Sequence, residues 1–176
     1  MAHRDAEPDA GHMFDRFFAR RAPGLRVVAE EDAHRPFLSD LFVACSPLRG
    51  MLPEPVVLQQ ASLRETAYRT DYPSAMRRIV LAQDRPIGRI MVDWSADDAA
   101  MLIDIAVVPD KQGAGVATAV VGAYLDVADH RRQSAALQVM RDNPALHWYA
   151  RLGFAPVEAQ DFAPYIDMTR EPRGGD

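Results

Sequence analysis

Two glycines one residue apart, Gly113 and Gly115, stand between an apolar run and a stretch with helical periodicity. Glycine lets a backbone turn tightly and bring its N–H groups close to a ligand. A helix that begins there adds unpaired N–H donors and the positive end of its dipole. The sequence therefore predicts an anion site suited to a diphosphate at residues 112–118. The alternative at this point is a tight strand-to-helix turn without a ligand.

Spacing argues against two other phosphate-binding motifs. A P-loop needs a Lys-Ser/Thr pair after its second glycine, and none is present. A dinucleotide fingerprint needs glycine or alanine where Thr118 stands, and an acidic residue about twenty positions on, where Gln138 stands. Neither motif fits the loop.

A second group of residues follows about 30 positions later, comprising Asn143-Pro144-Ala145, Tyr149 and Leu152-Gly153-Phe154. Asparagine before proline is a typical helix start, and glycine a typical helix stop. On such a helix Tyr149 shares a face with Ala145, four residues earlier. Tyr149 is either a functional hydroxyl or a packing residue of a core face.

The elements that must position these residues follow from hydrophobic periodicity and from Pro and Gly punctuation. The expected strands are Leu25–Ala29, Ile79–Ala82, Ile87–Trp94, Met101–Val108, Ala135–Met140, Phe154–Val157 and Tyr165–Thr169. The expected helices are Ala33–Cys45, Val56–Tyr68, one after residues 112–118 (the glycine loop), and one from Asn143-Pro144 to Gly153. The order β-α-α-β-β-β-α-β-α-β-β predicts a single α/β domain with a mixed sheet flanked by helices. We place this domain at residues 24–171, after a surface-docked N-terminal extension (1–23) and before a short tail (172–176).

Composition sets outer limits on the function. The chain has 176 residues and a formal net charge of −5, which argues against general nucleic-acid binding. No apolar run approaches the ~20 residues of a membrane-spanning helix, and no secretory signal is visible, so we expect a cytoplasmic protein. The single cysteine, Cys45, lies in an apolar helical stretch and is expected to be a buried structural thiol.

Together the two motifs resemble those of the GCN5-related N-acetyltransferases, over roughly residues 25–170. Gln112-Gly113-Ala114-Gly115-Val116-Ala117 is similar to the Gln/Arg-x-x-Gly-x-Gly/Ala signature, with Ala117 where glycine is commoner. Asn143, Ala145, Tyr149 and Gly153-Phe154 are similar to the next motif. The resemblance implies that acetyl-coenzyme A is the co-substrate, without a metal. It also implies a site in which Ile105, Ala106 and Val107 line the pantetheine arm and the N–H groups from Gly113 through Thr118 hold the diphosphate. Gln112 belongs to the same motif, Asn143 contacts the pantetheine, and Ala145 leaves room beside it.

For Tyr149 the resemblance implies a role in acetyl transfer. Transfer to an amine leaves coenzyme A as a thiolate, whose conjugate acid has a pKa of ~8.5. A tyrosine hydroxyl can hydrogen-bond that sulfur and donate a proton to it. The attacking amine must also lose a proton. Members of the family often place a glutamate where Gln138 stands, and a glutamine cannot act as a base.

Asp104 is the most unusual residue of the apolar run Met101–Val108 and is the candidate base. Its alternative is a structural carboxylate bonded to backbone N–H groups or to an arginine. Asp93 is a second candidate for the base. His147 stands two residues before the tyrosine in sequence and points away from it on a helix.

The leading hypothesis is an N-acetyltransferase that moves an acetyl group to a primary amine by direct attack in a ternary complex. Its partner would be an amine-bearing small molecule, peptide or protein, with neither nucleic acid nor membrane involved, and the enzyme would be a monomer or homodimer. The alternative is a non-catalytic acyl-coenzyme A-binding regulatory module. A structural protein on the same fold is the third hypothesis, and the intact glycine loop argues against it.

Overall fold

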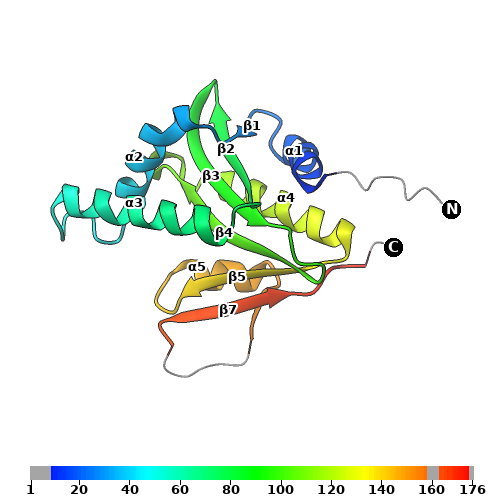
Figure 1. Ribbon diagram of the computed structural model, residues 1–176. Coiled ribbons are helices and arrows are strands. Elements are labelled where there is room, and N and C mark those ends of the chain that lie inside the picture. The colour runs from blue at the N-terminus through cyan, green and yellow to red at the C-terminus, as the bar shows by residue number, and fades with distance from the viewer. Residues whose placement is uncertain (1–8, 158–162, 175–176) are drawn as a thin grey trace.

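The computed structural model describes residues 9–157 and 163–174, which form a seven-stranded sheet with helices on both faces (Figure 1). The strands are β1 (Arg26–Ala29), β2 (Met76–Ala82), β3 (Arg85–Asp93), β4 (Ala99–Val107), β5 (Ser134–Met140), β6 (Ala155–Pro156) and β7 (Tyr165–Arg170). The helices are α1 (Ala10–Arg21), α2 (Arg35–Cys45), α3 (Glu54–Asp71), α4 (Val116–Arg131) and α5 (Ala145–Arg151), with 3₁₀ turns η1 (Asp32–His34) and η2 (Pro109–Lys111). The predicted α/β class and the predicted element order from β1 to β7 are confirmed.

The strand order is β1-β2-β3-β4-β5-β7-β6, and β4 with β5 is the parallel pair among otherwise antiparallel neighbours. Helices α2 and α3 lie on one side of the sheet, and α1 and α4 lie on the other (Figure 1). The larger core fills the space between the sheet and α1, α4 and α5, and a smaller one lies beneath α2. The parallel pair makes α4 a crossover between β4 and β5, which puts the glycine loop at the end of β4.

Strands β2 and β3 form a hairpin that turns at Gln83 and Asp84, both of which have positive φ. Positive φ at two consecutive residues is the type I′ geometry, whose twist matches that of the strands it joins. Pro36 lies in the first turn of α2, where its missing N–H leaves no helix hydrogen bond unmade. Local turn chemistry therefore agrees with the sheet order.

Helix α1 differs from expectation. The sequence predicted a surface-docked extension, but the side chains of Phe14 and Phe18 are fully buried and α1 packs along α4. Phenylalanines four apart share one helical face, which here faces the main core. The sequence of a short amphipathic helix shows that one face is apolar, but it does not show against which part of the protein that face packs. The domain limits at residues 24 and 171 stay predictions, and residues 1–8 and 175–176 lie outside the described part of the chain.

The separation of β4 from β5 is the feature that creates the site. Their pairing runs from Ala99↔Ser134 to Leu102↔Leu137 and stops there, although β4 continues to Val107 and β5 to Met140. A bulge opposite Met91 and Val92 skips Ile103 just where the two strands part. Beyond that point no strand of residues 9–157 and 163–174 lies beside this edge of β4. Among the described residues no helix is long and apolar enough to cross a membrane.

Candidate active site

The glycine loop has the backbone conformation that its glycines suggested. Gly113 has φ +77° and Gly115 has φ +82°, in the left-handed region that favours glycine. A Cβ at either position would meet no heavy atom of the protein within 4 Å. Glycine is therefore needed at these positions for the positive φ and not to avoid a clash with a neighbouring protein atom. The space beside both residues is open.

Most N–H groups of this loop and of the first turn of α4 have no backbone partner among the described residues. The Ala114 N–H donates to Lys111 O at 3.4 Å, and the first helical bond of α4 is from Ala119 N to Gly115 O at 3.0 Å. The N–H groups of Gly113 and of residues 115–118 donate to no backbone carbonyl of the described chain. A helix N-terminus with several free donors favours a multiply charged anion.

A pocket of about 300 Å³ lies on the loop. It is lined by Val107, Lys111, Gln112, Gly113, Gly115, Ala117, Thr118 and Trp148. Residues from the end of β4, from the start of α4 and from α5 thus share one cavity. The Lys111 ammonium adds a positive charge at its edge, which the sequence analysis did not single out.

The open edge of β4 leads from this pocket to the centre of the sheet. Val108 N donates to Ile87 O on β3, so alternation along the strand turns the backbone groups of Ala106 toward β3 and those of Ile105 and Val107 toward the open edge. The Val107 carbonyl accepts from Gln112 Nε2 at 2.9 Å. Ile105 therefore offers both backbone groups at this edge, whereas Val107 shares its carbonyl with a side chain.

Asn143 performs the capping role that competed with ligand binding. Its Oδ1 accepts from the backbone N–H of Ala145 at 2.9 Å, at the start of α5. The side-chain amide NH₂ points the other way from this bond, because the two groups of an amide lie on opposite sides of its carbon. Capping therefore occupies the acceptor of Asn143 and not its donors.

Tyr149 is buried, with 7% of its surface exposed, and packs between two aromatic rings. The centroid of Trp148 lies at 4.9 Å and that of Phe154, edge-on, at 5.8 Å. Its hydroxyl has no hydrogen-bond partner among the described residues. The packing contacts therefore explain the aromatic ring at this position but not the hydroxyl group. Burial, and in second place the Asp104 carboxylate, raises the pKa of Tyr149 to about 12. The hydroxyl is therefore a protonated donor throughout the physiological range.

Asp104 lies on β4 just past the bulge, with 13% of its side chain exposed. Its Oδ1 accepts from Arg64 Nη2 of α3 at 2.7 Å, and its Oδ2 lies 3.6 Å from Arg89 Nη1 of β3. Burial raises the pKa of the Asp104 carboxyl above its ordinary value, Arg64 and Arg89 oppose this, and Glu65 adds to it. The ion-pair alternative for Asp104 is thus present, and the carboxylate also acts electrostatically on Tyr149.

Other residues weighed as bases occupy different positions. The Asp93 carboxylate accepts from Ser95 N at 3.0 Å and from Ser95 Oγ at 2.8 Å, a local turn contact. His147 is exposed. Gln138 donates to the Asp167 carboxylate of β7 at 2.9 Å. The sequence analysis missed Asp167, because only the pairing of β5 with β7 brings it beside Gln138.

Cys45 is exposed, so the prediction of a buried thiol was wrong. It is the last residue of α2, and its Sγ lies 3.4 Å from Val107 O at the end of β4. The apolar residues before it suggested burial, but the C-terminal end of α2 lies at the rim of the site. Partial desolvation of the sulfur against the end of β4, and in second place the Asp104 carboxylate, raise the pKa of this thiol. Among the described residues no group of three or more His, Cys, Asp or Glu side chains is placed to hold a metal ion.

The described residues thus contain an open strand edge, a loop of free N–H donors at a helix start and the unpartnered hydroxyl of a buried tyrosine. Free N–H donors at a helix start favour a ligand with a diphosphate. Residues 35–154 match the model of the acetyltransferase (GNAT) family. The chain belongs to this family, and it is an acetyltransferase by family membership. The resemblance of the two sequence motifs is thereby confirmed.

Solved structures share the fold at low sequence identity. The PaiA N-acetyltransferase from Thermoplasma acidophilum, in complex with coenzyme A, is 14% identical with a TM-score of 0.63, covering 84% of this chain and 98% of its own. The ribosomal-protein-S18-alanine N-acetyltransferase from Escherichia coli is 18% identical with a TM-score of 0.63 (86% and 97% covered). A chimera of the spermidine N-acetyltransferase SpeG from Vibrio cholerae and hSSAT is 21% identical with a TM-score of 0.60 (84% and 95% covered). No protein with a curated function matches significantly.

Proposed function

We propose that this protein is an acetyl-coenzyme A-dependent N-acetyltransferase that acetylates a primary amine by direct attack in a ternary complex. The observation that carries the proposal is the Tyr149 hydroxyl, a protonated donor without a hydrogen-bond partner among the described residues, whose pKa the Asp104 carboxylate of β4 helps to raise. The family relationship and the PaiA structure with coenzyme A support the choice of co-substrate.

In this proposal the N–H groups of Gly113 and of residues 115–118 hold the diphosphate. Gln112 and Ala114 support the loop, through the bonds of the Gln112 side chain to Val107 O and of Ala114 N to Lys111 O. The pantetheine arm lies along Ile105, Ala106 and Val107, with the main backbone bonds at Ile105. The Asn143 amide donates to the arm, and Ala145 leaves room beside it.

The chemistry then needs one proton acceptor and one donor. A carboxylate whose pKa is raised is a stronger base, and Asp104 is our candidate for taking the first proton from the attacking ammonium. The amine nitrogen bonds to the acetyl carbon as the carbon–sulfur bond breaks. The Tyr149 hydroxyl hydrogen-bonds the sulfur as its negative charge develops. Because the pKa of Tyr149 is far above that of a thiol, full proton transfer from it is uphill, and the second nitrogen proton neutralises the thiolate.

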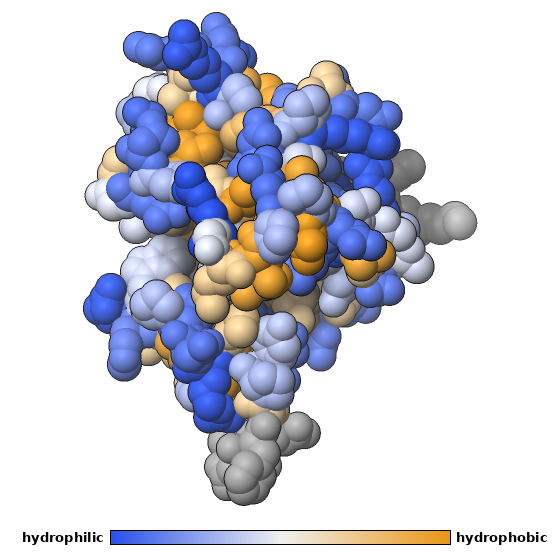
Figure 2. Space-filling model, turned by 90° about the vertical axis from the view of Figure 1, so that its left-hand side faces the viewer, coloured by the Kyte–Doolittle hydropathy of each residue, from blue (hydrophilic) through white to orange (hydrophobic). Residues whose placement is uncertain are grey.

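The acceptor reaches the site through the face where α3 begins and β5 ends. Figure 2 shows this face, with apolar side chains gathered across its middle and polar ones above and below. Large apolar side chains are exposed on both sides: Met51 and Leu52 in the α2–α3 connection, and Met140 and Tyr165 where β5 ends and β7 begins. We propose that these two groups contact the acceptor. A cytoplasmic location and a monomeric or dimeric state also stay predictions.

The test is a titration with acetyl-coenzyme A followed by thiol release with a panel of primary amines that includes polyamines and peptide N-termini. The proposal expects saturable binding and amine-dependent release of coenzyme A. Binding of acetyl-coenzyme A without release of thiol for every amine would favour the alternative, a non-catalytic regulatory module. Two features support that alternative: the bond of Arg64 to Asp104, and the glutamine at position 138. Absence of binding would overturn both.

A further inference from the structure

The Arg64 side chain is bound at the site as a small cationic ligand would be. Its Nη2 donates to Asp104 Oδ1 at 2.7 Å, and its Nε donates to Tyr68 Oη at 2.6 Å. The guanidinium carbon lies 5.1 Å from the ring centroid of Tyr68 and 5.5 Å from that of Phe42. A carboxylate with two aromatic faces is a recognition site for an organic cation. The Arg64 side chain itself is 45% exposed, so solvent and solutes reach it.

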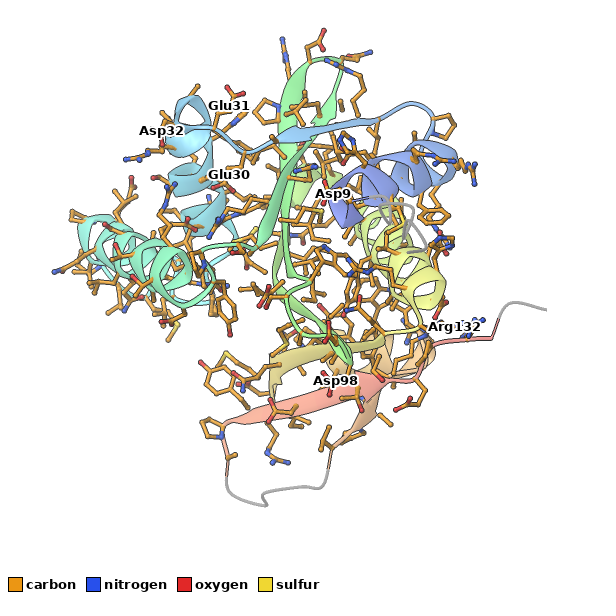
Figure 3. The ribbon with its side chains drawn as sticks, turned by 45° about the vertical axis from the view of Figure 1, so that its right-hand side comes forward. Asp9, Glu30, Glu31, Asp32, Asp98 and Arg132 are labelled. Atoms are coloured by element: carbon orange, nitrogen blue, oxygen red, sulfur yellow. The ribbon has the colours of Figure 1, made fainter. Side chains whose placement is uncertain are left out.

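The second cation beside Asp104 is fixed. Arg89 has a side chain only 4% exposed, and its Nε lies 2.9 Å from Glu30 Oε2. Its other nitrogens are bonded to both carboxylate oxygens of Glu65. Figure 3 shows Glu30 on the side of the sheet that carries α2 and α3. Three carboxylates thus surround one buried guanidinium, and one of them, Asp104, also binds the partly exposed Arg64.

In the proposed function an acceptor amine has to reach Asp104, which is where this cation lies. Asp104 lies on β4 just beyond the point where β4 and β5 separate. Its carboxylate contributes to the raised pKa of Tyr149 on α5 and of Cys45 on α2. A guanidinium there is a poor nucleophile. A primary ammonium in the same place could pass one proton to Asp104 and attack as the neutral amine.

We propose that Arg64 fills the cation subsite of the acceptor, formed by Asp104, Phe42 and Tyr68, and that the acceptor is a protonated primary amine that displaces it. This inference rests on the proposed N-acetyltransferase function. In the step, an N–H proton moves from the ammonium to Asp104, the freed nitrogen forms the bond to the acetyl carbon, and the carbon–sulfur bond breaks. The second nitrogen proton passes to the leaving thiolate, which departs as coenzyme A. The released Arg64 extends into solvent from the exposed side of α3. Arg64 is thus an internal competitor that sets the affinity and the charge preference for the acceptor.

The test measures binding of propylammonium to the full chain saturated with coenzyme A, at constant ionic strength. Removing the competitor with Arg64→Gln should tighten this binding by about fivefold, as expected for loss of one partly exposed ion pair. Arg64→Lys keeps a competing cation and should stay near the wild-type affinity. The matched control is Arg69→Gln on the same helix, because Arg69 is 49% exposed and faces Glu30 at 4.0 Å instead of Asp104. It should leave the affinity unchanged.

Weaker or unchanged propylammonium binding in Arg64→Gln overturns the inference, provided that the variant unfolds at the wild-type denaturant concentration. If Arg64→Gln does not fold, Arg64→Met is measured in its place. It should tighten propylammonium binding by the same factor, and unchanged affinity in Arg64→Met counts against the inference. Tightening that survives in the double variant Arg64→Gln/Asp104→Asn also overturns it. Because no acetyl group is transferred in this measurement, its outcome is independent of turnover. A wild-type protein that binds propylammonium as described yet never releases thiol from acetyl-coenzyme A would refute the proposed function instead.

Discussion

Gly115→Ala should have two separate effects, a lower stability from the strained backbone and a weaker affinity for acetyl-coenzyme A from a lost ligand contact. Gly115 has φ +82°, and an alanine in that conformation costs about 1–2 kcal/mol in stability. The added Cβ meets no protein atom within 4 Å, so no packing clash adds to this figure. Gly115 itself lines the pocket, beside the free N–H groups of the loop, so the added methyl group should compete there with a bound diphosphate. Loss of one hydrogen bond to a charged diphosphate, at about 1.5–3 kcal/mol, should raise the Kd for acetyl-coenzyme A by roughly 10-fold or more.

The chain offers a matched control in Gly50, which lies in the α2–α3 connection. Gly50 has φ +79°, and a Cβ there also meets no atom within 4 Å. Gly50→Ala should therefore lose the same 1–2 kcal/mol of stability in urea denaturation and leave the Kd for acetyl-coenzyme A unchanged by isothermal titration calorimetry. Equal affinities in the two variants would refute the assignment of the diphosphate to the loop.

Three further predictions concern the reacting groups and the core. Tyr149→Phe removes a hydroxyl without a protein partner, so stability and cofactor affinity should be unchanged while kcat falls about 10- to 100-fold; an unchanged kcat removes Tyr149 from the mechanism. If Asp104 is the base, kcat/KM should rise with pH through its raised pKa and fall away below it. Asp104→Asn should abolish this acidic limb and Asp167→Asn should keep it, and the reverse pattern would identify Asp167 as the base. Phe14→Ala should lower the free energy of unfolding by about 3–5 kcal/mol in urea, whereas a loss below about 1 kcal/mol would mean that α1 is detachable.

The strand and helix order was readable from the sequence because the signals were local. Glycine and proline mark the element ends, and the switch from an apolar run to helical spacing at Val116 marks the crossover. The loop conformation followed for the same reason, since Gly113 and Gly115 are where positive φ is needed. Local chemistry also predicted the cap that Asn143 provides.

The remaining features depend on contacts between distant segments. Arg89 and Glu65 are 24 residues apart, and Gln138 and Asp167 are 29 apart, so neither pair is visible before the sheet and α3 are assembled. The burial of Phe14 depends on α4, more than 100 positions later, as does the bond of Arg21 to Asp126. Cys45 shows the opposite error, because apolar neighbours along the chain did not make its own position buried. Charge partners and helix docking are properties of the tertiary structure, and the sequence offered only candidate residues for them.

The most direct test of the central claim is a crystal structure of the protein with coenzyme A bound. We expect the diphosphate on the N–H groups of Gly113 and of residues 115–118, and the pantetheine along β4 with its backbone bonds at Ile105. We also expect the sulfur within hydrogen-bond distance of Tyr149 Oη. A diphosphate bound away from this loop, or a sulfur beyond the reach of Tyr149, would contradict the claim.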